Sequence, residues 1–247
     1  MQLIAHRVFA DNRPIELPQF DGPVAPHGVE LDIRADSEGR PQVYHAPVFN
    51  VRRSRRVRIP KSLQAAEHFL TSEAPDLECL MLDIKSAAAA EAVGRYVAEN
   101  GMALPLVFNC WHEDDVATLR RYVPDAVIYY VIVPIVSRRV PRGRFRDLFV
   151  CNSYPFVSSR SAFTPRHDKA NQHNVNVKLL SRKRSLRMTL PYGISGICVH
   201  KLFYSDDLVE MAGARGIGVA VYGLSQRNLR RLRRLEGKAD YAIVGWT

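Results

Sequence analysis

The chain has 247 residues, 47% of them apolar, and a formal net charge of +10. This length is enough for one large core or two small ones, and the absence of any run of about 18 apolar residues excludes a membrane span. The short apolar start at residues 1–5 is not a secretory signal. The cysteines are far apart and mostly lie in or beside apolar runs, which predicts free thiols in a cytoplasmic protein: Cys79, Cys110, Cys151 and Cys198.

The positive charge is concentrated in three parts of the chain. Residues 133–194 contain thirteen Lys and Arg residues but only two acidic ones, Asp147 and Asp168. Two further basic clusters occupy residues 52–61 and 227–238. Such clusters favour anionic partners such as phosphate esters, an acidic membrane surface or nucleic acid. For the third cluster, a solvated helix face is the simpler interpretation.

Apolar alternation and capping residues predict a regular succession of strands and helices. Strands are predicted at residues 3–5, 28–34, 41–46, 78–85, 104–109, 126–133, 197–200, 218–222 and 241–245, and helices at 62–70, 87–99, 113–122, 205–214 and 225–235. Ser62 and Ser86 are the expected N-caps of the first two helices. Residues 8–27 and 47–61 are predicted to be loops, and the proline-rich, basic residues 134–194 receive no regular element.

Apolar strands that alternate with helices predict an α/β fold, a TIM (β/α)8 barrel. We expect one domain over residues 1–247, with an irregular basic segment at about 134–194. No helix follows the strand at 241–245, so the barrel is predicted to be incomplete at its last helix. A partner subunit, residues 134–194 or a truncation would account for the uncovered flank.

The strand at 28–34 carries two carboxylates on one face. Val29, Leu31 and Ile33 alternate with Glu30 and Asp32. Carboxylates buried on an apolar strand cost several kcal/mol unless they are compensated. Two oxygen ligands on one face suit a hard divalent cation, whereas an edge strand with its polar face in water explains the same alternation.

Several other polar residues fall where predicted barrel strands end. In a TIM barrel the carboxyl ends of all strands meet at one rim, which is where catalytic groups lie. Imidazoles there can act as acid and base, carboxylates can hold Mg²⁺ or Ca²⁺, and cationic side chains can neutralise phosphoryl oxygens. This combination indicates phosphodiester chemistry. The set comprises His6, Arg7, Glu30, Asp32, His45, Asp83 and Lys85.

Four short motifs together resemble the glycerophosphodiester phosphodiesterase family. They are Ile4-Ala5-His6-Arg7, Val29-Glu30-Leu31-Asp32-Ile33-Arg34, Val43-Tyr44-His45 and Leu82-Asp83-Ile84-Lys85. Residues 205–222 and 239–244 resemble the C-terminal part of the family, so the resemblance covers roughly 1–133 and 195–247.

The resemblance implies a TIM-type barrel with a small insertion after strand two, and metal-dependent hydrolysis to glycerol phosphate and an alcohol. A hydroxyl adjacent to the phosphate would attack first, and water would then open the cyclic phosphate. His6 and His45 would be the acid–base pair, with Mg²⁺ or Ca²⁺ as cofactor. The implied metal ligands are Glu30, Asp32 and Asp83, and the implied substrate-binding residues are Arg7, Lys85 and Tyr222.

Departures from the family pattern bear on the substrate more than on the reaction. Val8 replaces the usual glycine, Ala46 replaces an aspartate, Asp83 replaces a glutamate and Tyr222 replaces a tryptophan. Two alternatives stay open. One is lipid cleavage of the sphingomyelinase D or phospholipase D type with a cyclic phosphate product, and the other is a non-catalytic barrel that binds anionic surfaces. Expected partners are a small phosphodiester or lipid-derived substrate, an anionic membrane surface and a second copy of the chain, but not nucleic acid.

Overall fold

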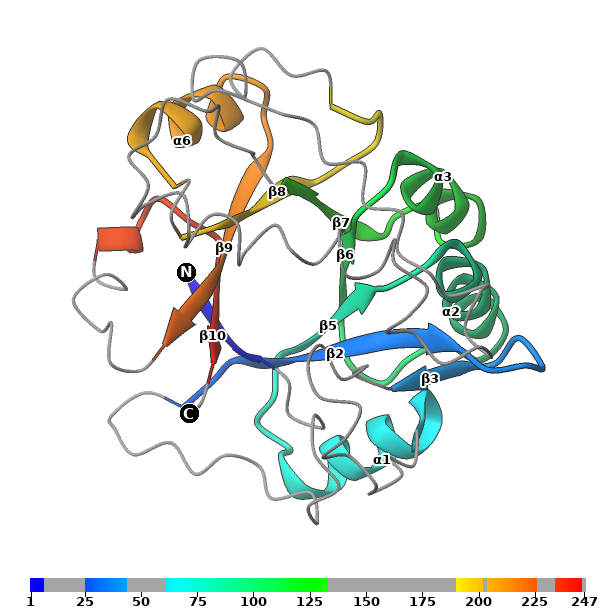
Figure 1. Cartoon of the computed structure of the whole chain (residues 1–247). Helices are drawn as coiled ribbons and strands as arrows, with labels where there is room; N and C mark the ends of the chain where they lie inside the picture. Colours follow the sequence, from blue (N-terminus) through cyan, green and yellow to red (C-terminus); the bar gives the residue numbers. More distant parts are fainter. Residues whose placement is uncertain (7–24, 44–60, 133–189, 202–203, 226–233, 246–247) are drawn as a thin grey trace, which may run out of the picture.

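The computed structural model describes residues 1–6, 25–43, 61–132, 190–201, 204–225 and 234–245 (Figure 1). Its strands and helices follow the predicted succession. The strands are β1 (Gln2–His6), β2 (Gly28–Ala35), β3 (Pro41–Val43), β4 (Lys61–Ser62), β5 (Cys79–Ile84), β6 (Leu106–Cys110), β7 (Val127–Ile132), β8 (Gly196–His200), β9 (Gly218–Ser225) and β10 (Tyr241–Gly245), and the helices are α1 (Leu63–Glu73), α2 (Ala87–Asn100), α3 (Glu113–Tyr122) and α6 (Asp206–Gly213).

Eight of the described strands form a closed parallel barrel. Their order is β1-β10-β9-β8-β7-β6-β5-β2, and β1 also pairs with β2 through Ile4–Gly28 and Ala5–Val29. A Cβ at Gly28 would lie 2.7 Å from the Cys79 carbonyl oxygen and 2.9 Å from Ile4 Cδ1, so this closure has no room for a side chain. The described helices lie outside the ring of strands (Figure 1). The TIM barrel prediction is thus confirmed.

The small insertion after strand two is also confirmed. Strand β3 pairs antiparallel with β2, and β4 pairs antiparallel with β3 at the edge of the sheet. Lys61, predicted to lie in a loop, forms β4 together with Ser62. The rest of the short strand predicted at 41–46 lies outside the described residues.

The helices match the prediction apart from one. Ser62 and Ser86 cap α1 and α2 as expected, accepting hydrogen bonds from the Ala65 and Ala89 backbone N–H groups at 3.1 Å each. The start predicted for the helix at 225–235 is wrong, because Ser225 is the last residue of β9. Residues 226–233 lie outside the described part, and so does most of the basic segment predicted at 134–194. None of the described helices has the length and apolar character that crossing a bilayer requires.

Side chains alternate between the inside of the barrel and the layer beneath the helices. One buried cluster contains strand residues only and fills the ring, whereas the other two also contain residues of the helices. Phe108 and Ile33, for example, pack on the same outer cluster as Val93 of α2 and Leu119 of α3. The interior cluster includes Ile4, Met81, Val107, Tyr129, Cys198, Ala220 and Ile243.

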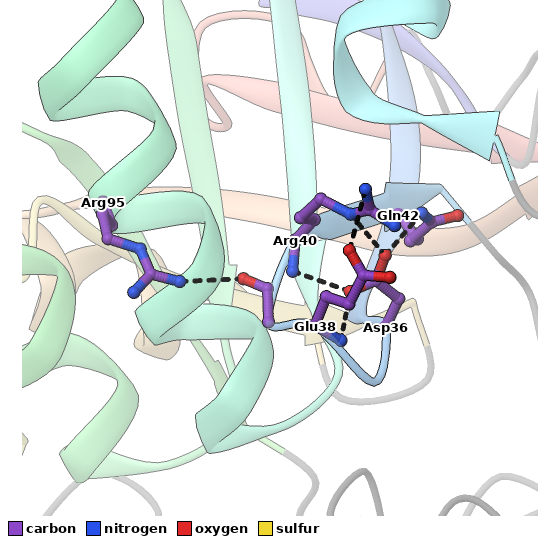
Figure 2. Close-up of polar contacts among 6 residues, drawn as sticks. Asp36, Glu38, Arg40, Gln42 and Arg95 are labelled. Atoms are coloured by element: carbon purple, nitrogen blue, oxygen red, sulfur yellow. Dashed lines mark hydrogen bonds and ion pairs between the residues drawn. The ribbon is translucent and has the colours of Figure 1, made fainter.

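The turn between β2 and β3 is held by one aspartate (Figure 2). Asp36 Oδ1 accepts hydrogen bonds from the backbone N–H groups of Glu38 and Arg40 at 2.9 Å each, and Asp36 Oδ2 accepts one from Arg40 Nε at 2.9 Å. Arg95 of α2 donates a hydrogen bond to the Gly39 carbonyl oxygen at 3.0 Å. The turn is therefore fixed internally and tied to the neighbouring helix, which anchors the carboxyl end of β2.

The Tyr129 side chain packs inside the barrel at the amino-terminal ends of the strands, which we call the barrel floor. The Tyr129 hydroxyl donates to Asp240 Oδ2 at 2.6 Å, and the same oxygen accepts the Val219 backbone N–H at 3.0 Å. The Tyr129 ring meets the Tyr241 ring edge-on at 5.2 Å. A Cβ at Gly196 would lie 2.3 Å from this ring, so the glycine makes room for it. Burial raises the pKa of Tyr129 strongly, which keeps its hydroxyl protonated as a donor.

We expect Tyr129→Phe to lower the free energy of unfolding by about 1 kcal/mol, because Asp240 loses one donor but keeps the Val219 N–H. Urea unfolding measures this loss. Tyr122→Phe is the matched control, because it removes a hydroxyl that contacts Glu91 on the outer face of the molecule and should cost less. Equal stabilities of the wild type and Tyr129→Phe would contradict the prediction.

Candidate active site

Of the polar residues predicted at the rim, the described ones come from β1, β2 and the C-terminal end of β5: His6, Glu30, Asp32, Asp83 and Lys85. Strand β2 pairs in register with β5, so that Asp32 lies directly opposite Asp83. Glu30 precedes Asp32 by two residues and shares its face of the strand. All three carboxylates are buried, with exposures of 2%, 4% and 7% for Glu30, Asp32 and Asp83.

The three carboxylates form a compact group. One oxygen each of Glu30, Asp32 and Asp83 lies within 4.8 Å of the others. The structure thus brings together the three residues predicted as metal ligands. Burial raises the pKa of Asp83, as does the charge of Asp32, whereas contacts with Lys85 and Trp111 act in the opposite direction.

Lys85 lies between two of these carboxylates. Its Nζ is 2.6 Å from Asp32 Oδ1 and also contacts Asp83 Oδ2. Lys85 directly follows β5 and is itself buried. The sequence motifs implied that Lys85 binds phosphate, whereas its described contacts here are ion pairs with two carboxylates. The oxygens of this acidic group are also the kind of ligand that hard divalent cations prefer.

Trp111 contacts the same group, and the sequence analysis missed it. Its Nε1 donates a hydrogen bond to Asp83 Oδ1 at 2.6 Å, and its ring centroid lies 5.4 Å from Lys85 Nζ. The signal was present in the alternation. Asn109 of β6 pairs with Asp83, and two residues later Trp111 points into the barrel again.

His6 borders the acidic group from β1. It is the last residue of that strand, and its Nε2 lies 3.7 Å from Glu30 Oε2. Its side chain is 28% exposed, so this imidazole can exchange protons with solvent and with a bound molecule. Arg7 and His45 lie outside the described residues. Strand β3 ends at Val43, the partner of Ile33, so the described chain stops beside the acidic strand, two residues before His45.

The opposite wall of the rim carries an imidazole and a phenol. His200 of β8 and Tyr222 of β9 are paired in register, and their rings meet edge-on at 5.2 Å. Tyr222, predicted to bind substrate, packs against the interior cluster and therefore faces into the barrel. Burial lowers the pKa of His200 to about 4, and Lys201 acts in the same direction, so His200 is neutral at pH 7.

Asp115 is a buried carboxyl that the sequence analysis also missed. It lies in the first turn of α3, where acidic residues are usually solvated, yet it is only 1% exposed. Burial raises its pKa to about 7; the backbone N–H of His112 acts in the opposite direction, and the charges of Asp114 and Asp83 add to the rise. Helical spacing places Asp115 one turn before the buried Leu119, which is the available signal.

We expect Asp115→Asn to change how stability depends on pH. A carboxyl whose pKa rises from 3.8 to about 7 on folding binds its proton more tightly in the native state, so stability falls as the pH rises through that window. The free energy of unfolding of the asparagine variant, relative to that of the wild type, should therefore be roughly 2–4 kcal/mol higher at about pH 8 than at about pH 4. Urea unfolding at both pH values measures the gain, and parallel pH dependences of the two proteins would refute it.

The chain matches no protein-family model and no curated protein, but solved structures match its fold. A phosphodiesterase from Oleispira antarctica in complex with the product sn-glycerol-3-phosphate is 13% identical, with a TM-score of 0.58 over 99% of this chain and 92% of that chain. A glycerophosphodiester phosphodiesterase from Parabacteroides distasonis is 12% identical, with a TM-score of 0.55 over 98% of this chain and 92% of the other.

A glycerophosphodiester phosphodiesterase from Agrobacterium tumefaciens is 14% identical to this chain, with a TM-score of 0.52 over 98% of it and 95% of the other chain. At such identities the likeness establishes the fold. The chain therefore has the barrel fold of the glycerophosphodiester phosphodiesterases, in agreement with the resemblance of its sequence motifs.

Proposed function

We propose that the protein is a metal-dependent phosphodiesterase that hydrolyses a glycerophosphodiester, or a similar small phosphodiester, to glycerol phosphate and an alcohol. The observation that carries this proposal is the group of three buried carboxylates with Lys85 between two of them and His6 beside the third. This group lies at the rim of the barrel where TIM-type enzymes carry their chemistry. The fold shared with phosphodiesterases of known structure adds support.

The substrate class is inferred from the fold neighbours and from charge. The Oleispira antarctica phosphodiesterase was solved with its product, sn-glycerol-3-phosphate. In this chain, Lys85 and Arg7 would neutralise phosphoryl oxygens, and Tyr222 would contact the substrate from the opposite wall of the rim. We propose a small phosphodiester as substrate on these grounds.

The donor set fits Mg²⁺ or Ca²⁺. Glu30, Asp32 and Asp83 offer only oxygen, which is what hard divalent cations prefer, and their oxygens are close enough to share one ion. When bound, such an ion would polarise a phosphoryl oxygen and orient the nucleophile.

The proton transfers of the reaction would be carried out by two histidine side chains. We propose that one imidazole of the His6 and His45 pair accepts the proton of the substrate hydroxyl that attacks phosphorus. The other imidazole donates a proton to the oxygen of the leaving alcohol. The P–O bond to the alcohol breaks as the cyclic phosphate forms, and water then opens the ring with the two imidazoles in exchanged roles.

Glu30→Gln and Asp32→Asn are expected to abolish divalent-ion binding and to lower activity about 100-fold or more. The assay is release of sn-glycerol 3-phosphate from a panel of glycerophosphodiesters, with and without EDTA, followed by add-back of Mg²⁺ or Ca²⁺. Glu78→Gln is the matched control, because Glu78 is exposed at the opposite end of β5. Full activity in EDTA, or in both carboxylate variants, would overturn the metal assignment.

His6→Asn is expected to lower kcat roughly 10²–10⁴-fold while leaving ion affinity close to that of the wild type, because the change removes a proton carrier and no ligand. Steady-state kinetics and calorimetric ion titration separate the two effects. Phosphorus NMR of the wild-type products adds a second readout. A cyclic phosphate that accumulates without hydrolysis would favour cleavage of the phospholipase D type over the hydrolysis proposed here.

Three further predictions belong to this proposal. Cys79, Cys110 and Cys198 are buried free thiols, which supports a cytoplasmic location. Binding of residues 134–194 to an anionic membrane surface and self-association of the chain stay predictions. Cosedimentation with acidic vesicles at two salt concentrations tests the first, and light scattering tests the second.

A further inference from the structure

Asp83 is held at both of its carboxylate oxygens by different side chains. Trp111 Nε1 donates a hydrogen bond to Oδ1 at 2.6 Å, and the Lys85 ammonium contacts Oδ2. With one oxygen on each partner, the carboxylate cannot rotate about its Cβ–Cγ bond without breaking a contact. The indole therefore helps to fix the orientation of the Asp83 carboxylate plane relative to Lys85.

The ring of Trp111 contacts Lys85 as well. The ammonium lies 5.4 Å from the ring centroid, within the range of about 6 Å over which a cation is attracted to an aromatic face. One residue thus constrains the acidic side chain through its N–H and the basic one through its ring.

Trp111 has the backbone support that a positioning role needs. It directly follows β6, whose Asn109 pairs with Asp83, and it packs partly buried against the interior cluster of the barrel. Helix α3 begins two residues later, at Glu113. The indole therefore comes from a short connection between two regular elements, and groups that hold a ligand in this way commonly tune its affinity for a metal ion.

We propose that Trp111 is a positioning residue that orients Asp83 and Lys85 so that the acidic group keeps its cation-binding shape. This inference rests on the proposed function and adds to it a residue that neither the sequence motifs nor the fold neighbours indicated. It requires that loss of the indole N–H weakens ion binding itself and not only turnover.

The test compares Trp111→Phe with Tyr129→Phe. Both changes remove an aromatic donor to an aspartate, but Tyr129 acts at the barrel floor. Calorimetric titration with Mg²⁺, Ca²⁺ or Mn²⁺ alone should show a dissociation constant raised roughly 10–100-fold in Trp111→Phe and unchanged in Tyr129→Phe. Steady-state kinetics at a fixed ion concentration should show a lower kcat that partly recovers when the ion is raised.

A second measurement does not require the Trp111 variant to fold. The chain has two tryptophans, so Trp246→Phe leaves Trp111 as the only indole. Adding the ion to this protein should change its fluorescence, and combination with His6→Asn should leave that change intact, because it reports binding and not turnover. An unchanged emission on ion binding would overturn the positioning role.

The outcomes separate the two proposals. Equal ion affinities of the wild type and Trp111→Phe overturn the role of Trp111 and leave the proposed phosphodiesterase standing. A wild-type protein that binds no divalent ion overturns both. Weaker ion binding in Trp111→Phe and Tyr129→Phe alike overturns the role of Trp111, because it shows a general loss of stability.

Discussion

The contact between Lys85 and the buried carboxylates is the constraint on which the rest of the site depends. Three acidic side chains lie together among buried residues that are mostly apolar, and ionised groups in such a place are stable only when they are compensated. The Lys85 ammonium compensates Asp32 and Asp83 in part. The parallel pairing of β2 with β5 is what makes the arrangement possible, because it sets the two aspartates side by side.

The barrel divides its tasks between its two ends. At the amino ends of the strands, the Tyr129 hydroxyl, Asp240 and the small Gly196 fill space and satisfy hydrogen bonds. At the carboxyl ends, His6 and the carboxylates leave charge and exchangeable protons within reach of a bound molecule. Stability and chemistry therefore depend on different layers of the same ring, which lets the rim vary without loss of the fold.

The sequence predicted the barrel and the acidic group because both follow from short-range periodicity. Alternation along residues 28–34 put Glu30 and Asp32 on one face, and neighbouring parallel strands bring Asp83 to them. The contacts of Lys85 and Trp111 could not be predicted in the same way. Alternation puts both residues on the inward face, but the atoms that meet depend on side-chain conformations that the sequence pattern does not give.

The same limit explains the other differences. Asp115 belongs to a run of three acids that looks solvated, and only the packing of α3 on the barrel buries it. The helix predicted from Ser225 begins too early, because β9 extends past Tyr222. The length of β9 depends on its pairing with β10, which lies elsewhere in the sequence. Local residue propensities therefore do not predict where β9 ends.

Closure between β1 and β2 is brief. Within the described residues only Ile4 and Ala5 are in register with β2, whereas β5 faces β2 over six positions. This seam runs directly beneath the site, with His6 on one side and Glu30 on the other. Local opening of the barrel between β1 and β2 would move the His6 imidazole away from the Glu30 carboxylate, while the other strand pairs of the barrel stay formed. The two residue pairs that join β1 to β2 therefore also help to keep His6 beside Glu30.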